Sequence, residues 1–175
     1  LFRLARSTGL LWSMLGAWVI FRWASQRDGP WAGLLGVAIW CFEPTVSAFT
    51  AVVTPDVCAT ALAAASTYAF MRASRAGGPS RAVGVGLLLG LAQLAKFTNL
   101  VLYLAWPIMA LLRPRGCELP TTRRQQFGDG FLIVVVSLLM INAGYLFDGS
   151  FTRLGDYSFV SKPLRGSATD AIEPE

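Results

Sequence analysis

The chain contains 175 residues, of which 54% are hydrophobic and only 14% are charged, and its mean hydropathy is +0.53. That composition is too apolar for an ordinary soluble domain and predicts an integral membrane protein. The net charge of +5 comes mainly from Arg residues, which lie in short breaks between apolar runs. This distribution indicates the orientation of the chain in a membrane and argues against nucleic-acid binding.

Four apolar runs are long enough to cross a bilayer, which takes about 20 residues. In chain order these runs are residues 7–26, 31–53, 57–73 and 130–147. The breaks between them are rich in Gly, Pro or charge, as helix ends usually are. Each run therefore predicts one membrane-spanning helix.

Residues 82–112 form a fifth apolar run, interrupted by the polar sequence Lys-Phe-Thr-Asn at positions 96–99. One helix of this length would measure about 46 Å, which is too long for an ordinary span. One span would also place the Arg residues before and after the run on opposite sides, although basic residues favour the cytoplasmic side. We therefore predict two short helices that turn at Lys96.

These runs together predict an all-α polytopic transmembrane bundle of about six spans, two of them short, with both termini exoplasmic. Residues 1–147 would form the bundle, as part of a larger membrane domain. Residues 148–175 would form an exoplasmic polar segment that leads to a missing C-terminal region. Because the chain starts without Met or a signal-peptide pattern, we expect it to be a piece of a longer protein.

The chain has no His, which excludes a Ser/His/Asp triad or a Cys/His zinc site within it and directs attention to acids and amines. Asp56 follows Thr54 and Pro55, a strong helix-start pattern in which an acid favours the positive end of the helix dipole. That structural role competes with a functional one. A carboxylate at the water-facing mouth of a bundle can bind a metal or orient a hydroxyl acceptor.

Glu43 lies about two-thirds of the way along its predicted span and is followed by Pro44. An ionisable side chain at that depth costs on the order of 2.5 to 3.5 kcal/mol unless it faces a wet or paired interior. The sequence therefore predicts a function or a buried pairing for Glu43. Pro44 predicts a kink that frees a carbonyl one turn earlier.

Lys96 could extend its ammonium to the membrane interface as a snorkelling side chain, or it could bind a phosphate. The predicted topology places it at the exoplasmic ends of adjacent helices together with Asp56. An acid and an amine are thus expected on the same membrane face. Gly84, Gly86 and Gly90, of which Gly86 and Gly90 have the spacing of a GxxxG motif, favour a helix-packing surface over a chemical role.

The sequence FEPTVSAFTAVVTPDV and the later GLLLGLAQLAKFTNLVLYLAWP resemble the membrane core of the dolichyl-phosphate-mannose protein mannosyltransferase-like glycosyltransferases. This multi-span C-type superfamily also includes the aminoarabinose transferases of lipid A. The resemblance runs from about residue 31 to 107. It is carried by short motifs at Pro44, Ala48, Thr54, Asp56, Gly90, Leu91, Lys96 and Phe97.

The resemblance implies a hexosyltransferase that takes a sugar from a polyprenyl-phosphate donor and passes it to an acceptor protein or glycolipid on the exoplasmic face. It implies that Asp56 lies near the acceptor or a divalent cation, that Glu43 supports it, and that Lys96 lies near the donor phosphate. The main catalytic acid of the family belongs to a loop that would precede this chain, so the fragment alone should be inactive. Phe49 replaces the family's frequent His.

A different class of protein stays open as an alternative, namely half of a secondary transporter in which Glu43 and Asp56 form an ion or proton site. A membrane scaffold without chemistry is a third. No inverted repeat supports the transporter. The Arg-rich composition favours a bacterial cytoplasmic (inner) membrane, with the site facing outwards.

Overall fold

The computed structural model describes residues 2–52, 54–112 and 122–148, and these residues form helices and connecting turns without a strand. The all-α prediction is confirmed for this part of the chain. The predicted polar segment 148–175 lies outside the described residues, except for residue 148. The elements, in chain order, are α1 (Phe2–Asp28), α2 (Pro30–Phe42), α3 (Pro44–Ala51), α4 (Asp56–Ala76), α5 (Pro79–Ala95), the 3-10 helix η1 (Phe97–Leu100), α6 (Val101–Leu111) and α7 (Arg123–Gly144).

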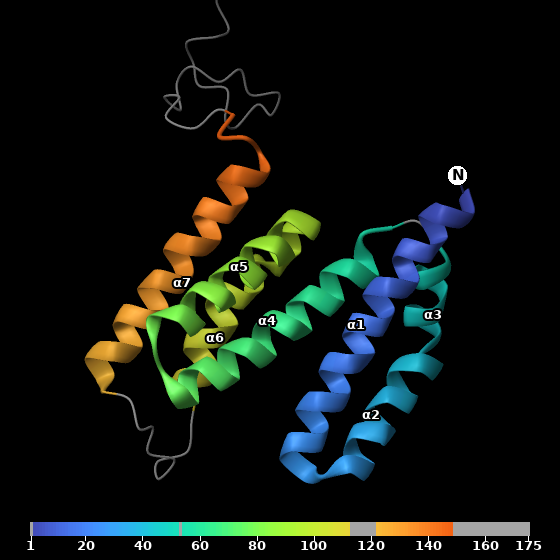
Figure 1. Cartoon of the computed structure of the whole chain (residues 1–175), viewed down its shortest axis with the longest axis horizontal. Coiled ribbons are helices and arrows are strands. Elements are labelled where there is room, and N and C mark those ends of the chain that lie inside the picture. The colour runs from blue at the N-terminus through green and yellow to red at the C-terminus, as the bar shows by residue number, and fades with distance from the viewer. Residues whose placement is uncertain (1, 53, 113–121, 149–175) are drawn as a thin grey trace, which may run out of the picture.

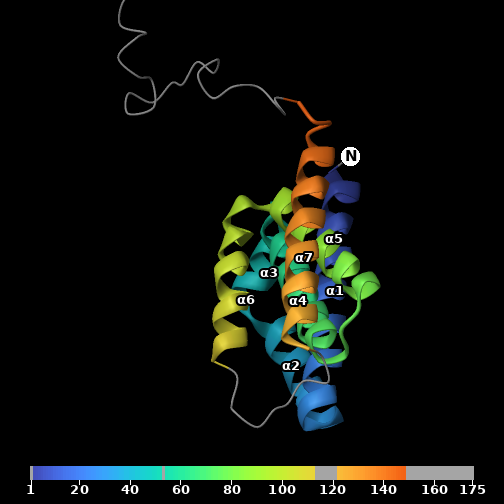
Figure 2. The same ribbon diagram turned by 90° about the vertical axis from the view of Figure 1, so that its left-hand side faces the viewer.

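The helices pack side by side in the order α2, α1, α4, α5 and α7 (Figure 1). The helix α6 contacts α4 and stands to one side of this row when the molecule is turned (Figure 2). Because the chain passes back and forth between two ends, the first turn of α4 and the last turn of α5 lie at the same end of the molecule (Figure 1).

Gly and Pro set the turns at the opposite end. Gly29, Gly77 and Gly78 have φ values of 94°, 62° and 109°, a region that residues with a Cβ rarely adopt. Pro30 and Pro79 then start α2 and α5, where their missing N–H groups are not needed. The predicted breaks at these positions are confirmed.

The predicted turn at Lys96 is also confirmed. The helix α5 ends at Ala95, Lys96 takes an extended conformation with φ −159°, and the chain reverses through η1 into α6. At the other end of the sequence, α7 starts at Arg123, seven residues before the predicted run 130–147. Thr122 in extended conformation precedes this helix, and no Pro interrupts the polar stretch that follows.

The helices α5 and α7 meet along a close-packed seam. A Cβ added at Gly86 would lie 2.7 Å from the Cβ of Val136, and one added at Gly90 would lie 2.5 Å from the Cβ of Met140. The absence of side chains at these positions lets the two backbones approach, as in other small-residue helix interfaces. The predicted packing role is confirmed for Gly86 and Gly90, but it is wrong for Gly84, where an added Cβ would meet nothing within 4 Å.

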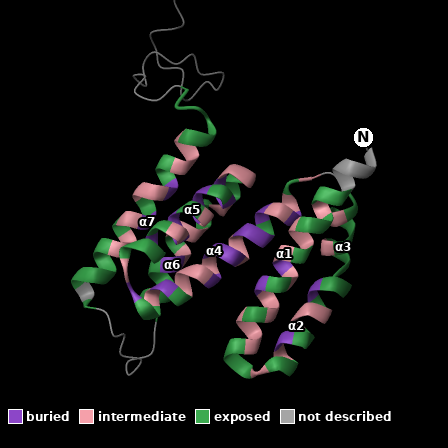
Figure 3. Cartoon of the chain, in the orientation of Figure 1, coloured by how far each residue is buried: buried purple, intermediate pink, exposed green. Residues whose placement is uncertain are grey.

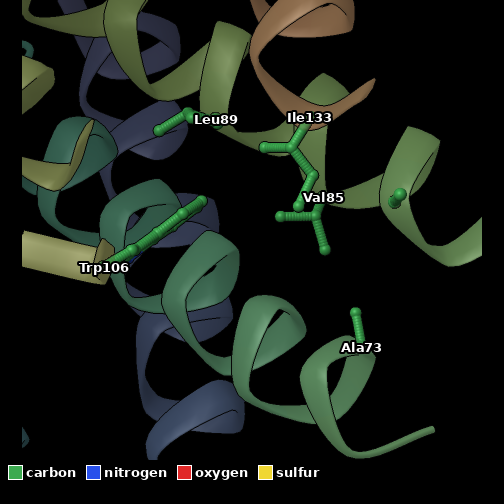
Figure 4. Close-up of a cluster of buried hydrophobic side chains, with 6 residues drawn as sticks. Ala73, Val85, Leu89, Trp106 and Ile133 are labelled. Carbon is green, nitrogen blue, oxygen red and sulfur yellow. The ribbon is translucent and has the colours of Figure 1, made fainter. Parts of the chain in front are cut away.

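A buried apolar cluster joins α4, α5, α6 and α7, and includes Ala73, Val85, Leu89, Trp106 and Ile133 (Figure 4). Trp106 of α6 also stacks on Phe70 of α4, with ring centroids 4.5 Å apart and an angle of 8° between the planes. This stacking fixes α6 against the row of helices.

Large apolar side chains are also exposed on the outer faces of α1, α2, α6 and α7, and these helices carry many exposed residues (Figure 3). Trp31 and Phe42 are 81% and 84% exposed. Among the described residues, one stretch is long and apolar enough to cross a membrane, Arg124–Gly144, with a mean hydropathy of 1.8. The pair α2 and α3 would be a second if the two helices are taken as one span bent by 57°.

Candidate functional site

Asp56 and Lys96 form an ion pair between two neighbouring helices. Asp56 is the first residue of α4, and Lys96 directly follows the last residue of α5. The Lys96 ammonium donates a hydrogen bond to Oδ1 of Asp56, and the two side chains are 44% and 30% exposed. An acid and an amine therefore lie together at one end of the described helices, whereas their membrane face and their roles remain predictions.

The ion pair also sets the charge state of Asp56. The hydrogen bond from Lys96 holds the pKa of the Asp56 carboxyl below its ordinary value of 3.8. The position of Asp56 in the first turn of α4 favours the same charged form, because the helix dipole is positive there. Asp56 is therefore a carboxylate at neutral pH and can accept hydrogen bonds only.

Asn99 positions the Lys96 turn, a role that the sequence analysis missed. Its side-chain amide donates hydrogen bonds to the carbonyl oxygens of Ala92 in α5, at 2.8 Å, and Ala59 in α4, at 3.4 Å. One side chain thus satisfies the last turn of α5 and ties it to the first turn of α4. A polar residue in the break at 96–99 was the only signal of this contact.

Glu43 occupies the break between α2 and α3, and Pro44 starts α3 there. The 57° bend confirms the predicted kink. Thr45 donates a hydrogen bond of 2.9 Å to Oε1 of Glu43, and the Ser47 hydroxyl donates one of 3.2 Å to the carbonyl oxygen of Cys41. These side chains supply hydrogen bonds at a place where Pro44 has no N–H to offer.

A cleft of about 220 Å³ lies between this break and the start of α4. Its lining comes from three helices and comprises Trp40, Thr45, Val46, Phe49, Asp56, Val57 and Thr60. Glu43 is not in the lining, but Thr45 links it to one wall, while Asp56 belongs to the other. Asp56 therefore forms part of one wall of the cleft, and Glu43 contacts the opposite wall through its hydrogen bond with Thr45.

The cleft combines an aromatic wall with polar groups. Trp40 is buried and its indole N–H donates to the carbonyl oxygen of Ser13 at 3.1 Å, which fixes the ring, whereas Phe49 is 40% exposed. The hydroxyls of Thr45 and Thr60 and the carboxylate of Asp56 offer hydrogen-bond partners. The volume is below the usual range for drug-sized ligands, so the cleft suits one small polar group.

The described residues do not by themselves form a metal site at Asp56. They contain no group of three or more His, Cys, Asp or Glu side chains placed to hold a metal ion. The Asp56 carboxylate faces the Lys96 ammonium, a competing cation. Metal binding by Asp56 stays a prediction.

The family model for "Dolichyl-phosphate-mannose-protein mannosyltransferase" matches residues 3–142, well over half of the chain. No curated protein and no solved structure matches the chain. The matched range contains Glu43, Asp56 and Lys96, so the whole candidate site lies within the part of the chain that carries the family likeness.

Proposed function

The chain belongs to the dolichyl-phosphate-mannose-protein mannosyltransferase family, and from this premise we propose that it is the membrane core of a glycosyltransferase. It would transfer a hexose from a polyprenyl-phosphate carrier to a hydroxyl acceptor on a protein or glycolipid. The observation that carries this proposal is the position of Asp56, which contacts Lys96 on one side and lines the cleft on the other.

The chemistry of such a transfer needs a cation at the departing phosphate and a carboxylate at the acceptor hydroxyl. We assign the phosphate to Lys96, because a compact ammonium near the membrane boundary suits a phosphate oxygen. We assign the acceptor hydroxyl to Asp56 at the wall of the cleft. Glu43 acts at a distance, by orienting Thr45 on the opposite wall.

We further propose that these helices form a polytopic bundle of about six spans in a bacterial inner membrane. Its site would face outwards, and both ends of residues 1–147 would lie on that side. The distribution of charge supports this orientation. Arg27, Arg75, Arg81 and Arg124 lie near helix ends at the opposite end of the molecule from Asp56 and Lys96.

A secondary transporter is the second candidate, and the broken pair α2 and α3 favours it. Transporters often place ion sites at such helix breaks near the membrane midplane. Glu43 lies at this break and is exposed. Against this candidate, Asp56 is paired with Lys96 rather than with a second acid.

The test is sugar transfer by the complete gene product in proteoliposomes, using a panel of radiolabelled polyprenyl-phosphate hexoses. We expect Asp56→Asn to lower the rate by about 10²- to 10⁴-fold, the range for loss of a group that handles a proton. Asp129→Asn is the matched control. That carboxylate accepts a hydrogen bond of 3.1 Å from the N–H of Gly78 at the other end of the molecule.

Equal rates for wild type and Asp56→Asn would contradict the assignment of Asp56. No transfer from any lipid-linked hexose, together with an ion flux that Glu43→Gln abolishes, would favour the transporter.

A further inference from the structure

The two residues of the ion pair, Lys96 and Asp56, have different ligands in the proposed function. Lys96 is assigned to the donor phosphate and Asp56 to the acceptor hydroxyl, yet the Lys96 ammonium contacts Asp56 directly. Within the described part of the chain, Asp56 is the one acid within ion-pair distance of Lys96. Before any ligand binds, the Lys96 ammonium and the Asp56 carboxylate are therefore bound to each other.

We propose that the donor phosphate and the Asp56 carboxylate compete for the Lys96 ammonium, so that binding of the phosphate releases Asp56 into the acceptor cleft. This inference rests on the proposed function. It adds an order of events, in which the donor site must be filled before the acceptor carboxylate becomes available.

The physical basis is repulsion between two anions at one cation. An ammonium has three N–H donors and could contact both groups, but a phosphate brought next to Asp56 places two negative charges within a few ångströms. The pair is partly exposed, with side-chain exposures of 44% and 30%, so water can reach both partners and the exchange requires no unfolding. Such exposed pairs are weak enough to be displaced.

The Asp56 carboxylate would be next to the acceptor cleft after its release from Lys96. Asp56 already lines the cleft with Thr45 and Thr60, so a carboxylate released from Lys96 is at the cleft wall without any change in the helices. Without the hydrogen bond from Lys96, the pKa of Asp56 returns towards its ordinary value, and the carboxylate becomes a better acceptor for a hydroxyl proton. Asn99 meanwhile holds the backbone of the Lys96 turn in place.

The experiment measures the affinity of polyprenyl phosphate for the complete gene product in phosphatidylcholine nanodiscs. We compare wild type, Asp56→Asn, Lys96→Gln and the double variant. Because Asp56 competes with the phosphate, we expect Asp56→Asn to tighten binding by about two- to fivefold, the range that exposed ion pairs allow. Lys96→Gln should weaken binding, and Asp56→Asn should then have no further effect.

Glu43→Gln is the matched control, because it removes the same charge from an acid that accepts a hydrogen bond from Thr45, whereas the ion pair of Lys96 is with Asp56. Its affinity should stay within about twofold of wild type. The melting temperature of each variant confirms that it is folded.

The possible results separate the two proposals. Unchanged or weaker binding in Asp56→Asn, with weaker binding in Lys96→Gln, would overturn the competition and leave the donor site standing. Unchanged binding in Lys96→Gln would overturn the donor site and the competition with it. Tightening that persists without Lys96, or that Glu43→Gln reproduces, would show a general charge effect and overturn the competition. The same pattern with phosphatidylglycerol as the probe would assign the pair to bulk lipid headgroups and also overturn it.

Discussion

The seam between α5 and α7 and the corner formed by α2 and α3 differ sharply in how they are packed. At the seam, Gly86 and Gly90 bring two backbones together, and Leu89 and Ser137 are completely buried. At the corner, α3 has no buried residue, and the 57° break before it borders a cleft. The seam is therefore closely packed, whereas the corner is packed more loosely.

The candidate site lies where these two regions meet. Lys96 follows α5, which the seam holds rigidly, whereas Thr45 and Phe49 belong to α3. Binding sites commonly draw on regions of low local stability, because a ligand must enter and leave. We therefore expect packing to fix the phosphate side of the site and the acceptor side to adapt to its ligand.

The largest expected effect comes from the apolar cluster behind the seam. Trp106→Ala should lower the free energy of unfolding by about 3 to 5 kcal/mol, because it leaves a cavity beside Phe70 and removes the stacked pair. Trp31→Ala, at a residue that is 81% exposed on α2, should change it by less than about 0.5 kcal/mol. Denaturant unfolding of both variants in one detergent measures the difference, and equal effects would remove the contrast between the two regions.

A smaller effect is expected at the seam itself. Gly90→Leu should destabilise the protein by about 1 to 3 kcal/mol, because its side chain would overlap Met140 and the carbonyl of Ser137. Gly84→Leu is the control on the same helix, since a Cβ there meets nothing within 4 Å. Thermal unfolding compares the two. A tolerated Gly90→Leu would mean that α5 and α7 are not held as closely as the structure shows.

At the corner, substitutions should affect function more than stability. Thr45→Val removes the hydrogen bond to Glu43 and should cost less than about 1.5 kcal/mol of stability while reducing sugar transfer. Thr50→Val removes a hydrogen bond within the same helix, to the carbonyl of Val46, and leaves the cleft lining unchanged. Its stability should fall similarly while its transfer rate stays close to that of wild type. A parallel loss of transfer in both variants would contradict the role given to Thr45.

The smallest effect is the pH dependence contributed by the ion pair. The pKa of Asp56 is lower in the folded protein than its ordinary value of 3.8, so the unfolded state takes up the proton first as the pH falls. The stabilisation is therefore present above this value and is lost as the pH falls through the lower folded value. The difference in melting temperature between wild type and Asp56→Asn should shrink from about pH 7 to about pH 3. A difference that grows on acidification would show that folding does not lower the pKa of Asp56.

The helix ends were predictable because their signals are local. Gly and Pro mark the turns at Gly29 and Gly78, and the polar break at Lys96 interrupts an apolar run. The spacing of Gly86 and Gly90 likewise predicted a packing face without identifying α7 as the partner.

The cleft was not predictable, because it depends on which helices become neighbours. Trp40 and Thr60 are far apart in the sequence, and neither has a local pattern that distinguishes a cleft wall from an ordinary helix face. Asn99 acts through contacts with two different helices, which a pattern along one helix cannot reveal. The sequence could identify Asp56 and Lys96 because charges in an apolar chain are costly and therefore conspicuous.

The most direct test of the proposed site is the thermal stability of the complete gene product with and without a polyprenyl-phosphate hexose. At about 100 times its dissociation constant, a ligand that binds only the folded state stabilises it by roughly 2.7 kcal/mol. We predict this stabilisation in wild type and in Arg81→Ala, whose cation lies at the other end of α5, and its loss in Lys96→Ala. Equal stabilisation in Lys96→Ala and wild type would contradict the placement of the donor phosphate, and no stabilisation of wild type by any lipid-linked hexose would contradict the transferase.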